Sequence, residues 1–257
     1  PMVEAPHKLG GIPIKPILAE SMQMGDENHT RQTACDYIYD RLMLPALFEL
    51  DRPKKEIMKT VRYIVDTPRF FHCYGQAAAR AALVAADGTE YSTMVTAVCG
   101  NGVEFGIKIA SLPGQWFTAP APMMKGRYTS SEFTEKDQLP WMGDSCVVEC
   151  YGMGGFAAAA SPIVCNLRGM TLKESIGQTK EMYRITMEKN YNFPIPNLDF
   201  DFLPVGIDIR KVLKEGVCPA IHGGMFNRVG GLIGAGMARV PMQCFEKALV
   251  AFGEKYL

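Results

Sequence analysis

Residues 93–109 read TMVTAVCGNGVEFGIKI and carry the clearest fold signal in the chain. Two runs rich in β-branched and apolar residues, 93–98 and 103–109, flank Gly100-Asn101-Gly102. Asn-Gly between such runs is a strong hairpin signal, because both residues tolerate the backbone angles of a tight turn. We therefore expect two antiparallel strands joined at this turn.

On the N-terminal side of the hairpin, the sequence has helical periodicity. Apolar residues recur at roughly helical intervals through residues 13–66, with Pro45 and Pro53 as interruptions, and an alanine-rich run at 70–86 follows. This pattern predicts a small helical subdomain over residues 12–68 and one more helix before the hairpin.

On the C-terminal side, helices and strands are mixed without regular βαβ alternation. Such a mixture favours an α+β fold with a mixed or antiparallel sheet, here over residues 69–257, rather than a doubly wound fold. The expected elements are strands at 116–118, 146–151, 217–225 and 232–240, a loop at 122–144, and helices beginning near 155 and covering 171–189 and 241–255.

Composition narrows the class of protein. The chain has 257 residues, of which 47% are hydrophobic, so it can bury a sizeable core. Lys and Arg number 27 and Asp and Glu 27, and no basic run is interleaved with aromatics, so we expect no nucleic-acid partner. The longest apolar stretch, 156–160, is too short to span a bilayer, and no signal peptide is visible, so we expect a cytoplasmic location.

The eight cysteines also suit a cytoplasmic location. They include no C-x-x-C pair and no His at zinc spacing, so we interpret them as reduced thiols. Cys146 and Cys150 lie four residues apart in an apolar run that we expect to be a strand, which would place both on one face as small buried residues.

Gly152, Gly154 and Gly155 follow that expected strand and partly match the dinucleotide-binding fingerprint. The acid that the fingerprint requires would be Glu174, but Thr171 and Glu174 have the spacing of a helix capping box instead. Nicotinamide binding is therefore disfavoured. A glycine turn before a helix still suits a phosphate or carboxylate; the alternative is that these glycines only permit tight packing.

Two charged clusters are further candidates. Asp26 and His29, followed by Arg31, have a spacing that would place the first two on one helix face, as half of a metal site or with Asp26 as a helix N-cap. Asp208 and Arg210 lie two apart in β-like sequence, as a substrate clamp or a surface ion pair.

Glu104, next to Asn101 in the hairpin, is a carboxylate within a strand. Such a carboxylate faces either solvent or a site, and solvent is the commoner environment for a charged side chain. Sequence alone therefore leaves both alternatives open.

Several motifs together resemble one known family, the AllG-like proteins, which include a subunit of oxamate carbamoyltransferase from allantoin degradation in purine catabolism. The resemblance runs from about Gly11 to the C-terminus. Members of that family are longer, and their N-terminal half carries a His-rich segment and a Gly-Pro-rich loop without counterpart here, so the chain corresponds to the C-terminal half. The motifs are MGDENH at 24–29, NGVEFG at 101–106, WFTAPAP at 116–122, GMGGF at 152–156 and GIDIRK at 206–211.

The resemblance implies a carbamoyl transfer on oxamate or oxalurate-type substrates, with phosphate or carbamoyl phosphate as co-substrate, no further cofactor and no assigned metal. It also implies a small anionic substrate, a second polypeptide that supplies the other half, and an oligomer. The alternatives are a non-catalytic scaffold subunit and a hydrolase or ligase acting on another small carboxylate. The implied site residues are His29, Glu104 and Asp208 as catalytic groups and Asp26, Arg31, Asn101, Gly152, Gly154, Gly155 and Arg210 as binding groups.

Such a reaction must hold two polar reactants within reacting distance. We therefore expect the Gly152 to Gly155 turn, the Asp208-Arg210 strand and the Asn101-Gly102 hairpin to form one pocket, with Glu104 facing inward. The chain departs from the family at 225–228, where members have a His, and at 67–71, where they have Asp-His before two aromatics.

Overall fold

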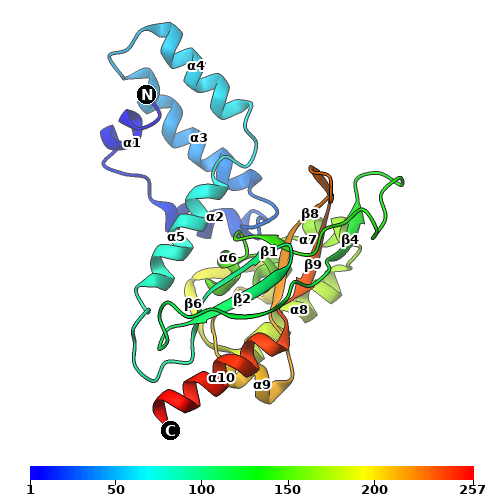
Figure 1. Ribbon diagram of the computed structural model, residues 1–257. Helices are drawn as coiled ribbons and strands as arrows, with labels where there is room; N and C mark the ends of the chain where they lie inside the picture. The colour runs from blue at the N-terminus through cyan, green and yellow to red at the C-terminus, as the bar shows by residue number, and fades with distance from the viewer.

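The computed structural model describes residues 1–257 and has the expected α+β architecture. Its N-terminal part is helical, with α1 (Glu4–Lys8), α2 (Ile14–Gln23), α3 (Thr33–Phe48) and α4 (Lys54–Val65). Figure 1 shows α1, α3 and α4 grouped away from the sheets, while α2 and α5 (His72–Val84) lie nearer to them.

Helix periodicity explains how this N-terminal part packs. Helix α4 buries Ile57, Thr60 and Ile64, which recur at helical spacing, and its exposed residues are mainly charged. Pro53 lies at the N-cap of α4, as a helix-starting residue, whereas Pro45 lies inside α3 and does not end it. The boundary at residue 68 stays a prediction, because one continuous apolar core runs through the helices and the sheets.

The predicted hairpin is confirmed. Strands β1 (Val95–Asn101) and β2 (Glu104–Ile109) pair antiparallel, with Gly100 opposite Phe105. They lie at the centre of a four-stranded sheet of order β3-β2-β1-β5, in which β3 is Phe117–Pro120 and β5 is Met142–Gly143. The C-terminal helix α10 (Met242–Tyr256) begins directly after Pro241, as the sequence predicted.

Two smaller antiparallel sheets accompany the four-stranded sheet. One has the order β4-β9-β8, formed by Lys125–Tyr128, Leu232–Arg239 and Ala220–Phe226. The other pairs β6 (Thr186–Ile195) with β7 (Asp201–Ile207). Strands β4 and β5 lie in the segment that we expected to be a loop. Strand β4 can pair with β9 because Gly126 has no side chain: a Cβ there would lie 2.1 Å from the carbonyl oxygen of Ala235 in β9.

The strand expected at 146–151 is wrong. The segment forms the short helix α6 (Val147–Cys150), in which every residue is buried. An apolar run that is buried on all sides has no period that separates a strand from a helix. Cys146 and Cys150 therefore lie one helical turn apart rather than on one face of a strand. All eight cysteines are free.

Three helices follow directly after α6 along the chain. The segment after α6 forms a 3₁₀ helix, η1 (Gly154–Ala160), and then α7 (Pro162–Leu167). Helix α8 (Leu172–Ile185) starts with the predicted capping box of Thr171 and Glu174, but it ends earlier than expected because β6 begins at Thr186. No helix in the structure combines the length and apolar character needed to cross a bilayer.

Candidate functional site

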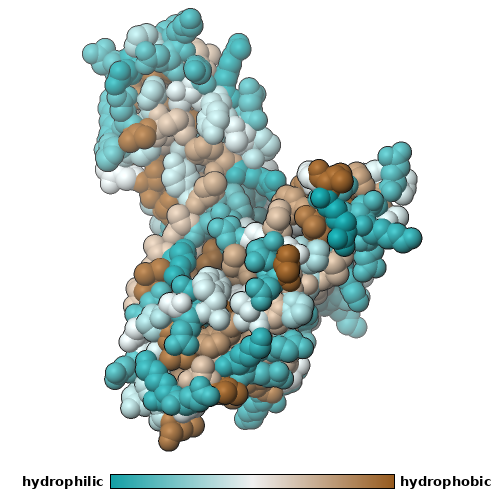
Figure 2. All heavy atoms as spheres, viewed as in Figure 1, coloured by the Kyte–Doolittle hydropathy of each residue, from teal (hydrophilic) through white to brown (hydrophobic).

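A pocket of about 410 Å³ lies where the N-terminal helical part meets the sheets. Figure 2 shows a hollow in the surface between the N-terminal helices and the projecting sheet formed by β4, β8 and β9. The lining comes from the α2–α3 connection, the start of α5, the segment between β5 and α6, and the β8–β9 ribbon. Its residues are His29, Thr30, Pro68, Arg69, His72, Cys73, Trp141, Met142, Gly143, Asp144, Ser145, Gly223, Gly224, Phe226, Leu232, Gly234 and Ala235.

The predicted cluster at 26–31 lies in the α2–α3 connection, not on a helix. Asp26 is buried and its Oδ2 accepts hydrogen bonds from the N–H groups of Ala34 and Cys35, at 2.8 and 3.0 Å. Its Oδ1 accepts from Arg31 Nη1 at 2.7 Å. Asp26 therefore caps the first turn of α3 from a distance, and burial raises its pKa to about 6 although these bonds oppose the shift.

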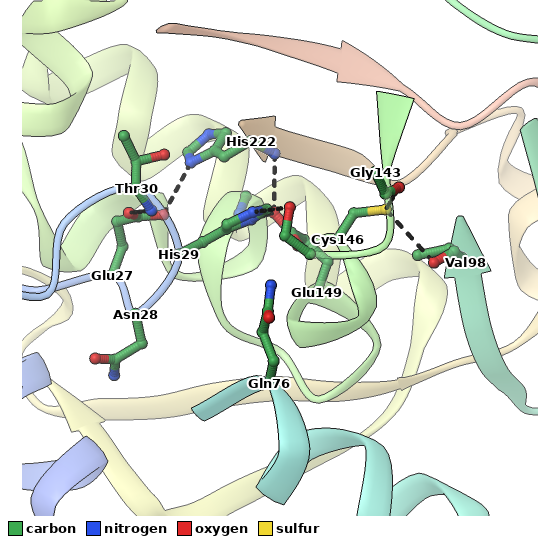
Figure 3. Close-up of polar contacts among 12 residues, drawn as sticks. Glu27, Asn28, His29, Thr30, Gln76, Val98, Gly143, Cys146, Glu149 and His222 are labelled. Carbon is green, nitrogen blue, oxygen red and sulfur yellow. Dashed lines mark hydrogen bonds and ion pairs between the residues drawn. The ribbon is translucent and has the colours of Figure 1, made fainter. Parts of the chain in front are cut away.

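Glu27 and His222 form a buried pair beneath the pocket (Figure 3). Glu27 accepts hydrogen bonds from the N–H groups of Thr30 and Arg31 through Oε1, and its Oε2 lies 3.2 Å from His222 Nδ1. Gln178 Nε2 donates to His222 Nε2 at 3.0 Å and to the carbonyl oxygen of Gly155. His222 therefore carries its proton on Nδ1 and donates to Glu27.

The pKa shifts agree with that assignment. Burial disfavours the Glu27 carboxylate, but the hydrogen bond from His222 and the charge of Arg168 outweigh it and lower the pKa of Glu27 to about 2. Burial and the charge of Arg168 lower the pKa of His222 to about 3. The pair is thus a carboxylate and a neutral imidazole at neutral pH.

Arg168 provides the balancing charge for this pair. It is buried, donates through Nε to the carbonyl oxygen of Gly236 at 3.0 Å and through Nη2 to Thr30 Oγ1. Its Nη1 is buried without a partner. Burial lowers the pKa of Arg168, while the charge of Glu27 opposes that shift.

His29 connects the buried polar residues to the pocket. Its Nδ1 lies 2.8 Å from Glu149 Oε1, and its Nε2 lies 2.9 Å from Ser145 Oγ. Figure 3 shows the imidazole pointing at Glu149, with Gln76 of α5 below it. The His29 ring stacks on His72, with centroids 5.8 Å apart and planes 14° apart. Burial and the neighbouring His29 lower the pKa of His72 to about 4.

Glu149 is held by backbone groups from two other segments. Its Oε1 accepts from the N–H of His222 at 2.8 Å and from the N–H of Gly155 at 3.1 Å, while Oε2 has no partner. Burial raises the pKa of Glu149, although His29 opposes this shift. A side chain at Gly154, where φ is +58, would lie 2.2 Å from the same carboxylate oxygen.

The N–H groups of the glycine turn therefore bind acceptors within the protein, two backbone carbonyl oxygens and one carboxylate. The N–H groups of Gly152, Gly154 and Gly155 donate to Glu149 O, Glu27 O and Glu149 Oε1. The expectation that these amides are free to hold a substrate anion is corrected, because each already has a partner. The turn positions the site instead of binding at it.

The expected pocket shared with the other two motifs is also wrong. Asn101 ends β1 and Glu104 begins β2, on either side of the hairpin turn. Asn101 Oδ1 accepts from the N–H groups of Val103 and Glu104. Glu104 is exposed and accepts from Thr118 Oγ1 at 3.0 Å. Neither lines the pocket of His29.

Asp208 and Arg210 lie at the other end of β1. Asp208 accepts from Thr93 Oγ1 at 2.8 Å and from the N–H of Arg210 at 2.9 Å, as the N-cap of α9 (Ile209–Glu215). Arg210 is largely exposed and pairs with Asp208. Strand β1 lies between this pair and the hairpin turn, and each of its residues adds roughly 3.3 Å to the distance between them.

Several site residues are absent from the sequence predictions, among them Glu27, Ser145, Glu149 and His222. One signal was present: Glu149 is a single carboxylate inside the apolar run CVVEC, and a lone charge in a buried run needs partners. The structure contains no group of three or more His, Cys, Asp or Glu side chains arranged to hold a metal ion.

Known proteins that are similar to this chain identify its family. The chain matches the family described as oxamate carbamoyltransferase subunit AllG over residues 1–145. It is 36% identical over 250 residues to an uncharacterized protein, YahG, of Escherichia coli (strain K12), which covers 96% of this chain and 53% of that protein. It is 35% identical over 247 residues to oxamate carbamoyltransferase subunit AllG of the same strain, covering 95% and 59%.

A solved structure has the same fold. The crystal structure of a conserved protein of unknown function from Enterococcus faecalis V583 is 36% identical, has a TM-score of 0.91, and covers 95% of this chain and 59% of that one. The chain thus spans somewhat more than half the length of the relatives it matches. Because the family match includes more than half of its residues, this chain belongs to the AllG family.

Proposed function

We propose that this protein is a subunit of a carbamoyltransferase that moves a carbamoyl group between phosphate and the amide nitrogen of oxamate or a close relative, and that the reaction takes place in the pocket beside His29. The observation that carries the proposal is the His29 imidazole. It is buried, oriented by Glu149 through Nδ1, and directed through Nε2 to the pocket wall. A relative at 35% identity is named a subunit of such an enzyme.

Carbamoyl transfer requires a proton acceptor. The amide nitrogen of the acceptor loses a proton as it attacks the carbamoyl carbon, and an oriented neutral imidazole is the usual general base. Glu149 accepts from Nδ1, so that Nε2 is the basic nitrogen and faces the pocket. His29 is therefore assigned to proton transfer.

The same pocket has groups of both charges for the reactants. Arg69 is exposed, lines the pocket and forms no ion pair, so its guanidinium can take a phosphate or the carboxylate of oxamate. Asp144, also exposed in the lining, can accept from the NH₂ group of a carbamoyl or oxamate amide. Arg210, to which the sequence assigned a binding role, lies outside this pocket.

The proposal includes a second polypeptide and a cytoplasmic location. The AllG relative is named a subunit, which supports a second polypeptide. The eight free cysteines support a cytoplasmic location, since reducing compartments keep thiols unpaired.

The test is an assay of the full protein together with the polypeptide that co-purifies with it. We expect cleavage of oxalurate that depends on phosphate, and transfer from carbamoyl phosphate to oxamate in the reverse direction. Cleavage that needs only water would favour the alternative of an amide hydrolase.

Two pocket variants distinguish catalysis from scaffolding. His29→Gln and Arg69→Gln should reduce transfer, while Glu104→Gln, an exposed change outside the pocket, should not. Full activity of the complex with both pocket variants would show that this chain is a scaffold for a site elsewhere.

A further inference from the structure

Ser145, His29 and Glu149 form a hydroxyl–imidazole–carboxylate series at the pocket wall. Ser145 Oγ is 2.9 Å from His29 Nε2, and His29 Nδ1 is 2.8 Å from Glu149 Oε1. Ser145 is half-buried and lines the pocket, whereas Glu149 has no exposed surface. We propose that Ser145 is a nucleophile that takes up the carbamoyl group covalently during transfer, an inference that rests on the proposed function.

The hydrogen-bond partners determine the direction of proton flow. Glu149 Oε1 already accepts from two backbone N–H groups, those of Gly155 and His222, so it is an acceptor toward His29 as well. His29 Nδ1 must then carry the proton, and Nε2 must accept from the hydroxyl of Ser145. That is the arrangement in which an imidazole removes a proton from a serine that attacks a carbonyl carbon.

Packing holds the three groups in this geometry. Ser145 lies just before α6 and Glu149 within it, and their spacing of four residues places them on one face of this turn. His29 is clamped by its stack on His72, and the missing side chain at Gly154 leaves room for the carboxylate. A serine that only satisfied a buried imidazole would not need access to a pocket, yet Ser145 has it.

The covalent route has two half-reactions. Ser145 Oγ attacks the carbamoyl carbon of carbamoyl phosphate, and its proton moves to His29 Nε2. The bond from that carbon to the phosphate oxygen breaks, and phosphate leaves with the electron pair and the proton from His29. In the second half, the amide nitrogen of oxamate attacks the carbamoyl-Ser145 ester and gives a proton to His29, which returns it to Ser145 Oγ as the ester bond breaks.

Isotope exchange separates this route from direct transfer. With the wild-type complex and no oxamate, labelled inorganic phosphate should enter carbamoyl phosphate, because the first half runs alone. Ser145→Ala should lower both this exchange and net transfer by roughly 10³-fold or more. Ser130→Ala, a half-buried serine outside the pocket, is the matched control and should retain both.

A fluorophosphonate probe reports the nucleophile independently of carbamoyl chemistry. It should attach to Ser145 in the wild type and the Ser130→Ala variant, as peptide mass mapping would show, and not in His29→Gln. Ser145→Cys should keep part of the exchange, because a thiol can replace the hydroxyl as nucleophile.

The outcomes distinguish the two proposals. Net transfer that persists in Ser145→Ala, without phosphate exchange in the wild type, would overturn the covalent route and leave the carbamoyltransferase standing. Absence of net transfer by the wild-type complex, with oxamate and carbamoyl phosphate both present, would overturn the proposed function and the covalent carbamoyl step with it.

Discussion

Individual residues set the charge state of the interior beneath the pocket. Glu27 is a carboxylate because His222, Arg168 and two backbone N–H groups compensate for its burial. His222 is neutral because it is enclosed and lies near Arg168. Removing one partner from such a group leaves an uncompensated buried charge, which costs roughly 3–5 kcal/mol.

Folding stability should therefore depend on pH. The pKa of His222 is about 3 and that of His72 about 4 in the folded protein, against 6.5 for free histidine. Between these values the two histidines bind more protons in the unfolded chain, so their contribution to the free energy of unfolding should fall as pH decreases from about 6.5. Carboxyl groups whose pKa values burial raises contribute in the opposite direction: Asp26, to about 6 from 3.8, and also Asp36, Asp40 and Glu149.

Urea denaturation at a series of pH values measures this effect. Relative to wild type, His72→Gln should lose less stability as pH decreases below about 6.5, because one of the two histidines is removed. His7→Gln, on an exposed histidine, is the control and should leave the slope unchanged. An identical slope in wild type and His72→Gln would mean that His72 is not held neutral by the fold.

At the scale of elements, the ends of short helices depend on single carboxylates. Asp208 caps α9 and also accepts from Thr93 at the start of β1, so it ties a helix to the central sheet. Hydrogen bonds from Arg210 and Thr93 lower the pKa of Asp208 against the effect of burial. Arg210 itself is mostly exposed and adds a surface pair.

We expect Asp208→Ala to lower the free energy of unfolding by about 0.5–2 kcal/mol, the range for a lost N-cap. Arg210→Lys should change it by less than about 1 kcal/mol, as for a surface ion pair, and should leave transfer unchanged because Arg210 is outside the pocket. Urea denaturation and the transfer assay measure the two quantities. Loss of transfer in Arg210→Lys with normal stability would return Arg210 to the active site.

Two glycines give a matched test of element packing. A Cβ at Gly155 would lie 2.1 Å from the carbonyl oxygen of Ala220, so Gly155→Ala must separate η1 from β8 and should cost about 1–3 kcal/mol. Gly177 lies inside α8 with nothing within 4 Å, so Gly177→Ala should stabilise by about 0.5–1 kcal/mol. Thermal or urea unfolding of both variants checks the opposite signs, and equal effects would contradict the packing argument.

At the scale of the whole molecule, the pocket joins segments that are far apart in the chain. His29 and Arg69 come from the helical part, Asp144 and Ser145 from the segment before α6, and Gly223 from the β8 strand. A ligand in this pocket contacts both parts and should stabilise the assembled structure. Binding only to the folded state raises stability by RT ln(1 + [L]/Kd).

Saturating oxamate or phosphate should therefore raise the unfolding temperature of the wild type. Stabilisation of roughly 2.7 kcal/mol is expected at a ligand concentration about 100 times Kd. Arg69→Gln should lose most of it, while Arg62→Gln, an exposed arginine of α4 outside the pocket, should keep it. Equal shifts for both variants would show that the anion binds away from Arg69.

Local features were predictable from sequence because their causes are local. The β1–β2 hairpin follows from a turn between two strand-forming runs, the start of α8 from the spacing of Thr171 and Glu174, and α10 from a helical period after Pro241. Family membership also came from motifs, and His29 was singled out within one of them. Each of these depends on residues within a few positions of one another.

Only the tertiary structure decided the site. His29 contacts Glu149 across 120 positions, and Glu27 contacts His222 across 195, so no local spacing encodes either contact. It also decided that residues 147–150 are a helix, because complete burial erases the period that would identify it, and that the Gly152 to Gly155 amides bind the protein's own acceptors. A buried charge requires a partner, and which residue becomes that partner depends on how distant segments pack.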